Sequence, residues 1–274
     1  VLTGSATVFI GATAEDIPDL FAENYDGTST LPSATGTNAL ALQDGAVASA
    51  NRSIAVGRDA VSSGNYSVAL GVYTDAINSF GTALGYKAQT ASGDYATALT
   101  NSRASGSNSF AAAIADNTST YGATGANSVA IGQQAKATAV NSTALGWASQ
   151  TSGNGRSTAI GYNTNASNYG ATALGFTTTA SGGYSTAIGR STNVSGQDSV
   201  GIGYQADTSV NNQIVLGGTT QQVKISNTYT LPIADGTANQ VLTTDGSGAV
   251  TFATAGGGAD LYAANPSSAT DPTA

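Results

Sequence analysis

A short alternation of small and apolar residues recurs along the middle of the chain. It is Asn-Ser-Val-Ala-Ile-Gly at residues 127–132, and close variants follow at 141–146 and 156–161. The gaps between copies are 14 or 15 residues except between Ala98 and Ala130. The alanine slot falls at thirteen positions, namely Ala41, Ala55, Ala69, Ala83, Ala98, Ala111, Ala130, Ala144, Ala159, Ala173, Ala187, Gly201 and Val215. This period is too short for a helical repeat but fits two strands and two tight turns, so it predicts the coils of a β-solenoid or β-roll.

The prolines set the limits of the predicted roll. Proline removes a ladder donor and is confined to the edges and ends of sheets, and none of the five lies between Ser33 and Leu231. We predict a connector over residues 1–38 and an uninterrupted roll of thirteen coils over 39–218. The roll is expected to bulge or loop out at 100–126, where two spacings fail. Such a loop is either a recognition element or a tolerated insertion.

The alternation also predicts faces, because successive side chains of a strand point to opposite sides. Val129 and Ile131 share one face, which we take as the core. A coil buries few apolar side chains against an ordering cost of about 1 kcal/mol per residue, so one chain alone is expected to have too small a core. We therefore predict a homotrimer in which faces of small residues pack between chains. The predicted packing residues are Ser128, Ala130, Gly132, Ala144, Gly146, Ala159 and Gly161.

The pattern changes after the roll. Asp245-Gly246 lies between two alternating apolar runs, which predicts a β-hairpin connector over residues 219–254. A longer repeat links residues 241–243 to 1–3 and residues 260–263 to 19–22. Residues 255–274 are then the start of a following unit, and the chain is one of several tandem copies in a longer protein. Coincidence in a sequence of low complexity is the alternative.

Composition narrows the chemistry. Charged residues make up 9% of the chain, the net charge is −8, and there is no His or Cys. These values predict no nucleic-acid partner, no Ser-His or Cys-His nucleophile, and no catalytic site, metal or cofactor. No apolar run approaches the ~20 residues of a membrane span, so no membrane insertion is expected. Residues 256–260 faintly resemble a calcium-binding glycine motif, but a hinge is the preferred interpretation.

One slot of the repeat carries candidate binding residues. The position after the motif glycine is aromatic or cationic in five successive coils, at Trp147, Tyr162, Phe176, Arg190 and Tyr204. Stacked coils bring such residues into one ladder. The ladder is either corner packing between coils, with Arg190 on aromatic faces, or a strip on which a glycan stacks.

The motifs at residues 127–132 and 66–71 resemble the head repeats of trimeric autotransporter adhesins, the YadA-like β-roll. That resemblance implies a left-handed parallel β-roll, an intertwined trimer and binding of host surface or matrix molecules. Residues 229–248 are similar to segments of bacteriophage tail fibres and virion appendages. The predicted fold is all-β: a parallel β-roll of coils of about 14 residues in a homotrimeric fibre, with flanking hairpins.

These features predict a non-enzymatic structural fibre of a phage virion that attaches the virion to its host. It would lie on the virion surface and bind a cell-surface glycan or protein receptor. The alternative is a bacterial trimeric surface adhesin or extracellular filament protein, located at the bacterial cell surface.

Overall fold

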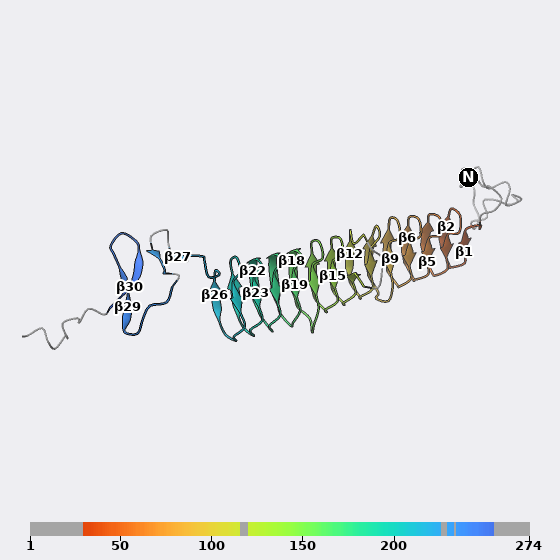
Figure 1. Ribbon diagram of the computed structural model, residues 1–274. Coiled ribbons are helices and arrows are strands. Elements are labelled where there is room, and N and C mark those ends of the chain that lie inside the picture. The colour runs from red at the N-terminus through yellow and green to blue at the C-terminus, as the bar shows by residue number, and fades with distance from the viewer. Residues whose placement is uncertain (1–29, 116–119, 226–228, 233, 255–274) are drawn as a thin grey trace, which may run out of the picture. The chain divides into compact units, whose positions relative to one another are not determined.

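The computed structural model describes residues 30–115, 120–225, 229–232 and 234–254. The chain divides into two compact units, Val1–Val215 and Leu216–Ala274. In the first unit the chain winds as a stack of coils, and each coil gives one strand to each of two parallel sheets (Figure 1). Each sheet has thirteen strands. The predicted β-solenoid of thirteen coils is thus confirmed.

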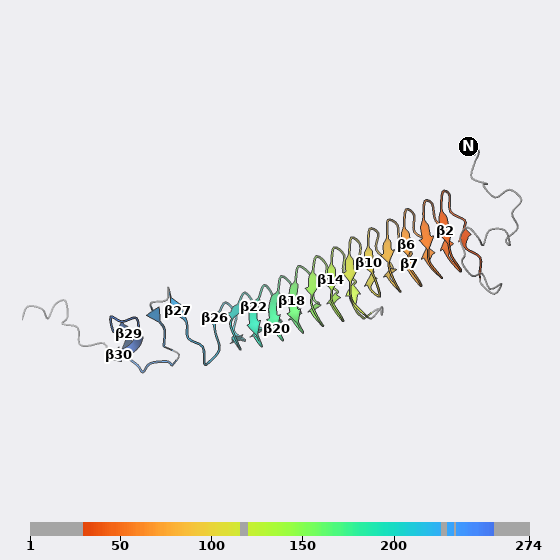
Figure 2. The ribbon, with the colours of Figure 1, turned by 90° about the horizontal axis from the view of Figure 1, so that it is seen from above.

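The strands are short and follow one another with little variation. The odd-numbered sheet contains β1 (Ser33–Ala34), β3 (Val47–Ala48), β5 (Val61–Ser62), β7 (Asp75–Ala76), β9 (Gln89–Thr90), β11 (Arg103–Ala104), β13 (Gly122–Ala123), β15 (Lys136–Ala137), β17 (Gln150–Thr151), β19 (Asn165–Ala166), β21 (Thr179–Ala180), β23 (Asn193–Val194) and β25 (Asp207–Thr208). The even-numbered sheet contains β2 (Leu40–Leu42), β4 (Ile54–Val56), β6 (Val68–Leu70), β8 (Thr82–Leu84), β10 (Thr97–Leu99), β12 (Phe110–Ala112), β14 (Val129–Ile131), β16 (Thr143–Leu145), β18 (Thr158–Tyr162), β20 (Thr172–Phe176), β22 (Thr186–Arg190), β24 (Val200–Ile202) and β26 (Ile214–Leu216). Figure 2 shows the two rows of strands along the stack.

The interior of the roll is built mainly from the small residues of the motif, not from its Val, Ile and Leu positions. Ala130, Ala144 and Ala159 have no exposed surface within a single chain, and Ser128 has none either. Val129 is only half-buried. The predicted faces are therefore reversed: the small face is the core of each roll, and the Val/Ile face points outward.

The same burial overturns the predicted trimer packing residues. The Ser and Ala members of that set are enclosed between the two sheets of their own chain, so they have no surface to offer a second chain. The glycine members, Gly132, Gly146 and Gly161, are half-buried, and Gly161 lies within β18. They have φ values of 120°, 121° and 129°, which favour glycine. A Cβ on Gly146 would collide with the carbonyl oxygen of Gly161 in the next coil.

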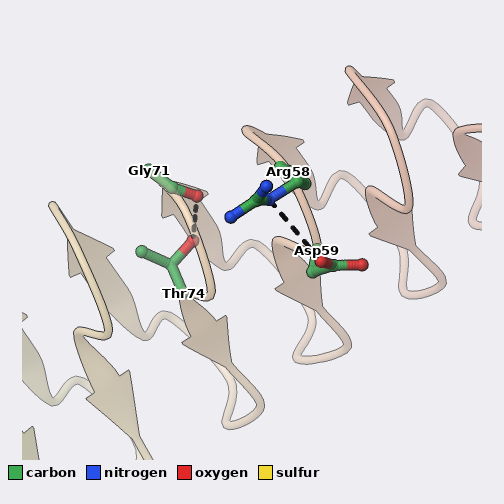
Figure 3. Close-up of polar contacts among 4 residues, drawn as sticks. All are labelled: Arg58, Asp59, Gly71 and Thr74. Atoms are coloured by element: carbon green, nitrogen blue, oxygen red, sulfur yellow. Dashed lines mark hydrogen bonds and ion pairs between the residues drawn. The ribbon is translucent and has the colours of Figure 1, made fainter. Parts of the chain in front are cut away.

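The motif serine has a defined role inside the coil. Ser128 Oγ donates a hydrogen bond of 2.6 Å to the Gly125 carbonyl oxygen, and Ser142 Oγ donates one of 2.6 Å to that of Ala139. Because a buried hydroxyl without a partner is costly, the hydroxyl and the turn carbonyl satisfy each other. Thr74 makes the same three-residue bond to Gly71 at the opposite turn, at 3.0 Å (Figure 3).

The turns stack as regularly as the strands. One residue before the motif serine adopts a left-handed conformation, with φ of 58° at Tyr66 and 53° at Asn127. The amide of Tyr66 donates to the Asn51 carbonyl of the preceding coil at 2.9 Å. The turn amides thus continue the ladder between coils, which satisfies backbone groups that two short strands alone leave open.

The irregular stretch at 100–126 leaves both sheets continuous. Phe110 pairs with Thr97 on one side and with Val129 on the other. The extra residues therefore leave the stack at one turn, between β12 and β13. Residues 116–119 lie outside the described part of the chain, so the outward loop stays a prediction.

The second unit contains two hairpins. Strands β27 (Lys224–Ile225) and β28 (Tyr229–Thr230) pair antiparallel, as do β29 (Gln240–Thr244) and β30 (Val250–Thr254). The second pair is the hairpin predicted from Asp245-Gly246. The predicted repeat start at 255–274, with its glycine segment 256–260, and most of the connector at 1–38 lie outside the described residues. The tandem array stays a prediction.

The buried alanine slot gives a direct test of the corrected faces. Ala159→Leu places a large side chain between the sheets and should destabilise the roll by about 1–3 kcal/mol or more. Thr158→Val, one residue earlier and facing outward, should change stability by less than about 0.5 kcal/mol. Chemical denaturation measures both. Tolerance of Ala159→Leu together with a large loss in Thr158→Val would restore the original assignment.

Candidate functional site

A row of apolar side chains runs along the outward face of the even-numbered sheet. Leu70, Leu145 and Leu174 are 38%, 40% and 41% exposed. The register aligns Leu145 with Ile160 and Ile160 with Leu174, so their side chains lie directly one above another. This outward apolar row consists of Leu42, Val56, Leu70, Leu84, Leu99, Ile131, Leu145, Ile160, Leu174, Ile188 and Ile202.

The opposite sheet presents a different surface. Its outward positions are mainly polar and bond along the stack: Gln89 Nε2 donates to Asp75 Oδ2 at 2.9 Å, and Arg103 donates to Gln89 Oε1. Asn193 Nδ2 donates to Asp207 Oδ1 at 3.2 Å in the same way. Because contiguous exposed apolar surface marks interaction sites, the even-numbered sheet is the candidate assembly face.

The predicted aromatic ladder is present at one corner of the roll. The ring centroids of Trp147 and Tyr162 are 4.6 Å apart, and those of Tyr162 and Phe176 are 4.8 Å apart. Phe176 pairs in register with Arg190, whose guanidinium lies 4.1 Å from the Tyr204 ring centroid. The five predicted residues therefore form one column through successive coils, the Trp147 column.

The ring geometry distinguishes the two interpretations of this column. The interplanar angles are 12° and 8°, so the rings stack nearly face to face. Tyr162 has a ring against each of its faces and offers solvent only its edge and hydroxyl. A sugar that stacks on an aromatic residue needs a free ring face, so the geometry favours packing between coils. Ligand binding by these five residues stays a prediction.

A second aromatic column, which the sequence analysis missed, lies at the other corner. Tyr66 and Phe80 are 5.1 Å apart and Phe80 and Tyr95 are 4.6 Å apart, with interplanar angles of 5° and 2°. Arg52 Nη1 donates to the Tyr66 hydroxyl at 2.7 Å. The signal was in the sequence: these residues recur in the slot just before the motif serine or its small replacement.

Cations on the roll are placed against rings rather than carboxylates. Five of the eight Lys and Arg residues lie over tyrosine rings at 4.1–5.6 Å from the centroid, namely Arg52, Arg58, Lys87, Arg156 and Arg190. Within the described residues the structure has one ion pair, Arg58–Asp59 at 4.0 Å (Figure 3). Both partners are half-exposed, so this pair contributes little.

The described parts of the chain contain no cluster of side chains that could form a metal site. No group of three His, Cys, Asp or Glu residues there is placed to hold a metal ion. Nor do residues 30–115, 120–225, 229–232 and 234–254 include a helix of the length and hydrophobicity of a membrane span.

Comparison with known proteins gives a family match for the coils. The model of the YadA head domain repeat matches residues 48–74, 76–99, 123–149, 137–164, 154–178, 166–192 and 180–206. These ranges are therefore similar to the YadA head repeat, as the motif resemblance implied. No curated protein sequence matched. Among solved structures, the collagen-binding domain of the Yersinia adhesin YadA matches with 21% identity over 79% of this chain and 83% of that chain, at a TM-score of 0.21.

The two interpretations of the Trp147 column predict different results for Tyr162→Ala. If the rings pack the coils together, the variant loses two stacked contacts, each worth about 0.5–1.5 kcal/mol. Its stability to denaturant should fall while attachment to cells stays unchanged. Unchanged stability with lost attachment would instead support a glycan strip.

Proposed function

We propose that this chain of YadA head repeats is a non-enzymatic segment of a bacterial adhesin fibre, exposed at the cell surface. The observation that carries the proposal is the repeat match along a stack of coils. A stack of this kind is a rigid spacer that displays side chains in long columns, which suits attachment better than catalysis. The ligand on this account is a cell-surface glycan or protein receptor.

We propose further that the fibre is a homotrimer assembled through the outward apolar row. Each roll leaves this row of Leu, Ile and Val side chains half-exposed or exposed, because its interior is filled mainly by small residues. Closed cyclic association covers the row on every chain at once. Three is the number that the resemblance to trimeric autotransporter adhesins implies.

A phage tail fibre or virion appendage is the second candidate. It rests on the similarity of residues 229–248 to segments of such fibres, whereas the family match concerns the coils and favours the bacterial adhesin. The parent reading frame separates the two candidates. A membrane-anchor segment in the same frame supports the adhesin, and neighbouring portal and baseplate genes support the virion fibre.

Charge on the outward apolar row should prevent assembly. Leu145→Lys combined with Leu174→Lys places two ammonium groups per chain in the proposed interface, where burial of a charge is costly. Sedimentation velocity should show a trimer for the natural chain and a monomer for the variant. Gln150→Lys with Thr179→Lys adds the same charge to the opposite sheet and should leave the trimer intact. A folded monomer of the natural chain contradicts the proposed assembly.

The attachment role predicts where the protein is found and what its loss does. Antibodies against the roll should label intact bacteria of the source strain, and deletion of the gene should lower attachment of those cells to their host surface by about tenfold or more. Restoring the gene is the control. Labelling of virions instead of cells would favour the phage fibre, and unchanged attachment after deletion would reject the adhesive role.

A further inference from the structure

We propose that one corner of the roll carries a binding site for a neutral glycan, formed by Tyr95 and the row of Asn108, Asn127 and Asn141 that follows it. This inference rests on the proposed attachment function and gives that function a location and a ligand class. The site is at the corner opposite the Trp147 column.

The four residues occupy the same slot of consecutive coils. Their φ values are 60°, 52°, 53° and 54° in chain order. The amide of Asn108 donates to the Asp94 carbonyl at 2.9 Å, and that of Asn127 donates to the Ser107 carbonyl at 2.7 Å. Because each side chain leaves an equivalent turn position, the three amides form a line that begins beside the Tyr95 ring.

Tyr95 is the last ring of its stack. One face lies against Phe80, with centroids 4.6 Å apart, and no second ring contacts Tyr95 in the described part of the chain. Its exposure is 57%, against 43% for Phe80. Asparagine is much shorter than tyrosine, so the outer part of the second ring face stands above the asparagine row. This free face is the feature that the Trp147 column lacks at Tyr162, and the apolar C–H face of a pyranose can stack on it.

The asparagine row supplies oriented hydrogen-bonding groups. Asn108 Nδ2 donates to Asn127 Oδ1 at 3.2 Å, and Asn127 Nδ2 donates to Asn141 Oδ1 at 3.0 Å. An amide side chain has two donor hydrogens and two acceptor lone pairs, so each of the three retains donor and acceptor capacity. All three residues are exposed. The bonds between them fix the amide planes in advance, which lowers the ordering cost of binding hydroxyl groups.

The charges around the row favour an uncharged ligand. Asp94 is at the Tyr95 end, where its Oδ1 accepts from the Ser79 amide at 3.1 Å. Arg156 occupies the slot after Asn141, and its guanidinium lies 5.6 Å from the Tyr169 ring centroid. One charge of each sign at opposite ends leaves the row itself neutral. Three coil steps of ~4.8 Å give a length of about 14 Å, enough for a short oligosaccharide lying along the roll.

Binding of defined sugars to the full chain tests the site. The probes are cello-, manno- and galacto-tetraose, with sialyllactose as the acidic control, measured by saturation-transfer NMR and titration calorimetry. At least one neutral tetraose should bind more tightly than sialyllactose. Tyr95→Asn and Asn127→Gly should each weaken that binding about tenfold. Both replacements tolerate a left-handed backbone, so both variants should stay folded. Asn127→Gly should melt close to the natural chain, whereas Tyr95→Asn loses its single ring stack with Phe80 and should melt at a lower temperature.

Tyr184→Asn is the matched control. Tyr184 occupies the same slot, with φ of 54° and 58% exposure, but Gly170 and Asp198 take its neighbouring slots in place of asparagines. Its loss should leave sugar binding unchanged. Equal effects of Tyr95→Asn and Tyr184→Asn, or no binding of any neutral tetraose to the natural chain, would overturn the proposal.

Cell attachment separates this inference from the function on which it rests. Attachment that depends on the gene but is unaffected by Tyr95→Asn would remove the glycan site and leave the adhesive role standing. Tetraose binding that is sensitive to Tyr95→Asn, in a protein whose deletion leaves attachment unchanged, would establish the site and reject the adhesive role.

Discussion

The space between the two sheets of each coil is filled mainly by small side chains, and the other features of the roll follow from this. Among the described residues, the fully buried side chains are mainly Ala, Ser and Thr, with Ile114 and Val194 the largest. A coil of about 14 residues with strands of two to five residues encloses little volume. Most of the larger apolar residues therefore lie outside, mainly on the even-numbered sheet. Their burial requires a second chain, and this requirement is the reason for the proposed assembly through the outward apolar row.

Because the coils stack at a constant spacing, equivalent residues of successive coils line up in columns along the roll. A residue type that recurs at one slot becomes a continuous column, whether of leucines, rings or amides. In the Trp147 column, the faces of the Tyr162 ring are covered by neighbouring rings of the same column. The column of Tyr66, Phe80 and Tyr95, here the Tyr95 column, ends at Tyr95 and leaves one ring face open next to asparagines. The identity of the residue at the end of a column thus decides between packing and recognition. A repeat of nearly constant sequence can in this way carry a local site.

The sequence predicted the coil period, the number of coils, the Asp245-Gly246 hairpin and the Trp147 column, because each depends on spacing alone. It did not predict which face is inside. Alternation places Val129 and Ala130 on opposite faces of the strand. Which face lies inside depends on the volume that the turns enclose, and alternation carries no information on that volume. The alanine position hardly varies between coils, whereas its neighbours do. This difference indicated that the alanine side faces an interior with room for small side chains. The Tyr95 column, which also contains Tyr66 and Phe80, was missed because its residues precede the motif serine, whereas the predicted ladder follows the motif glycine.

Solvent access to single cysteines tests the central claim, since the natural chain has no cysteine. Leu174 is more exposed than Thr179 in one chain, yet assembly through the outward apolar row should hide it. Leu174→Cys in the native protein should react with a maleimide far more slowly than Thr179→Cys, and both should react fully once denatured. Equal native rates, or faster labelling at Leu174→Cys, would contradict assembly through that face.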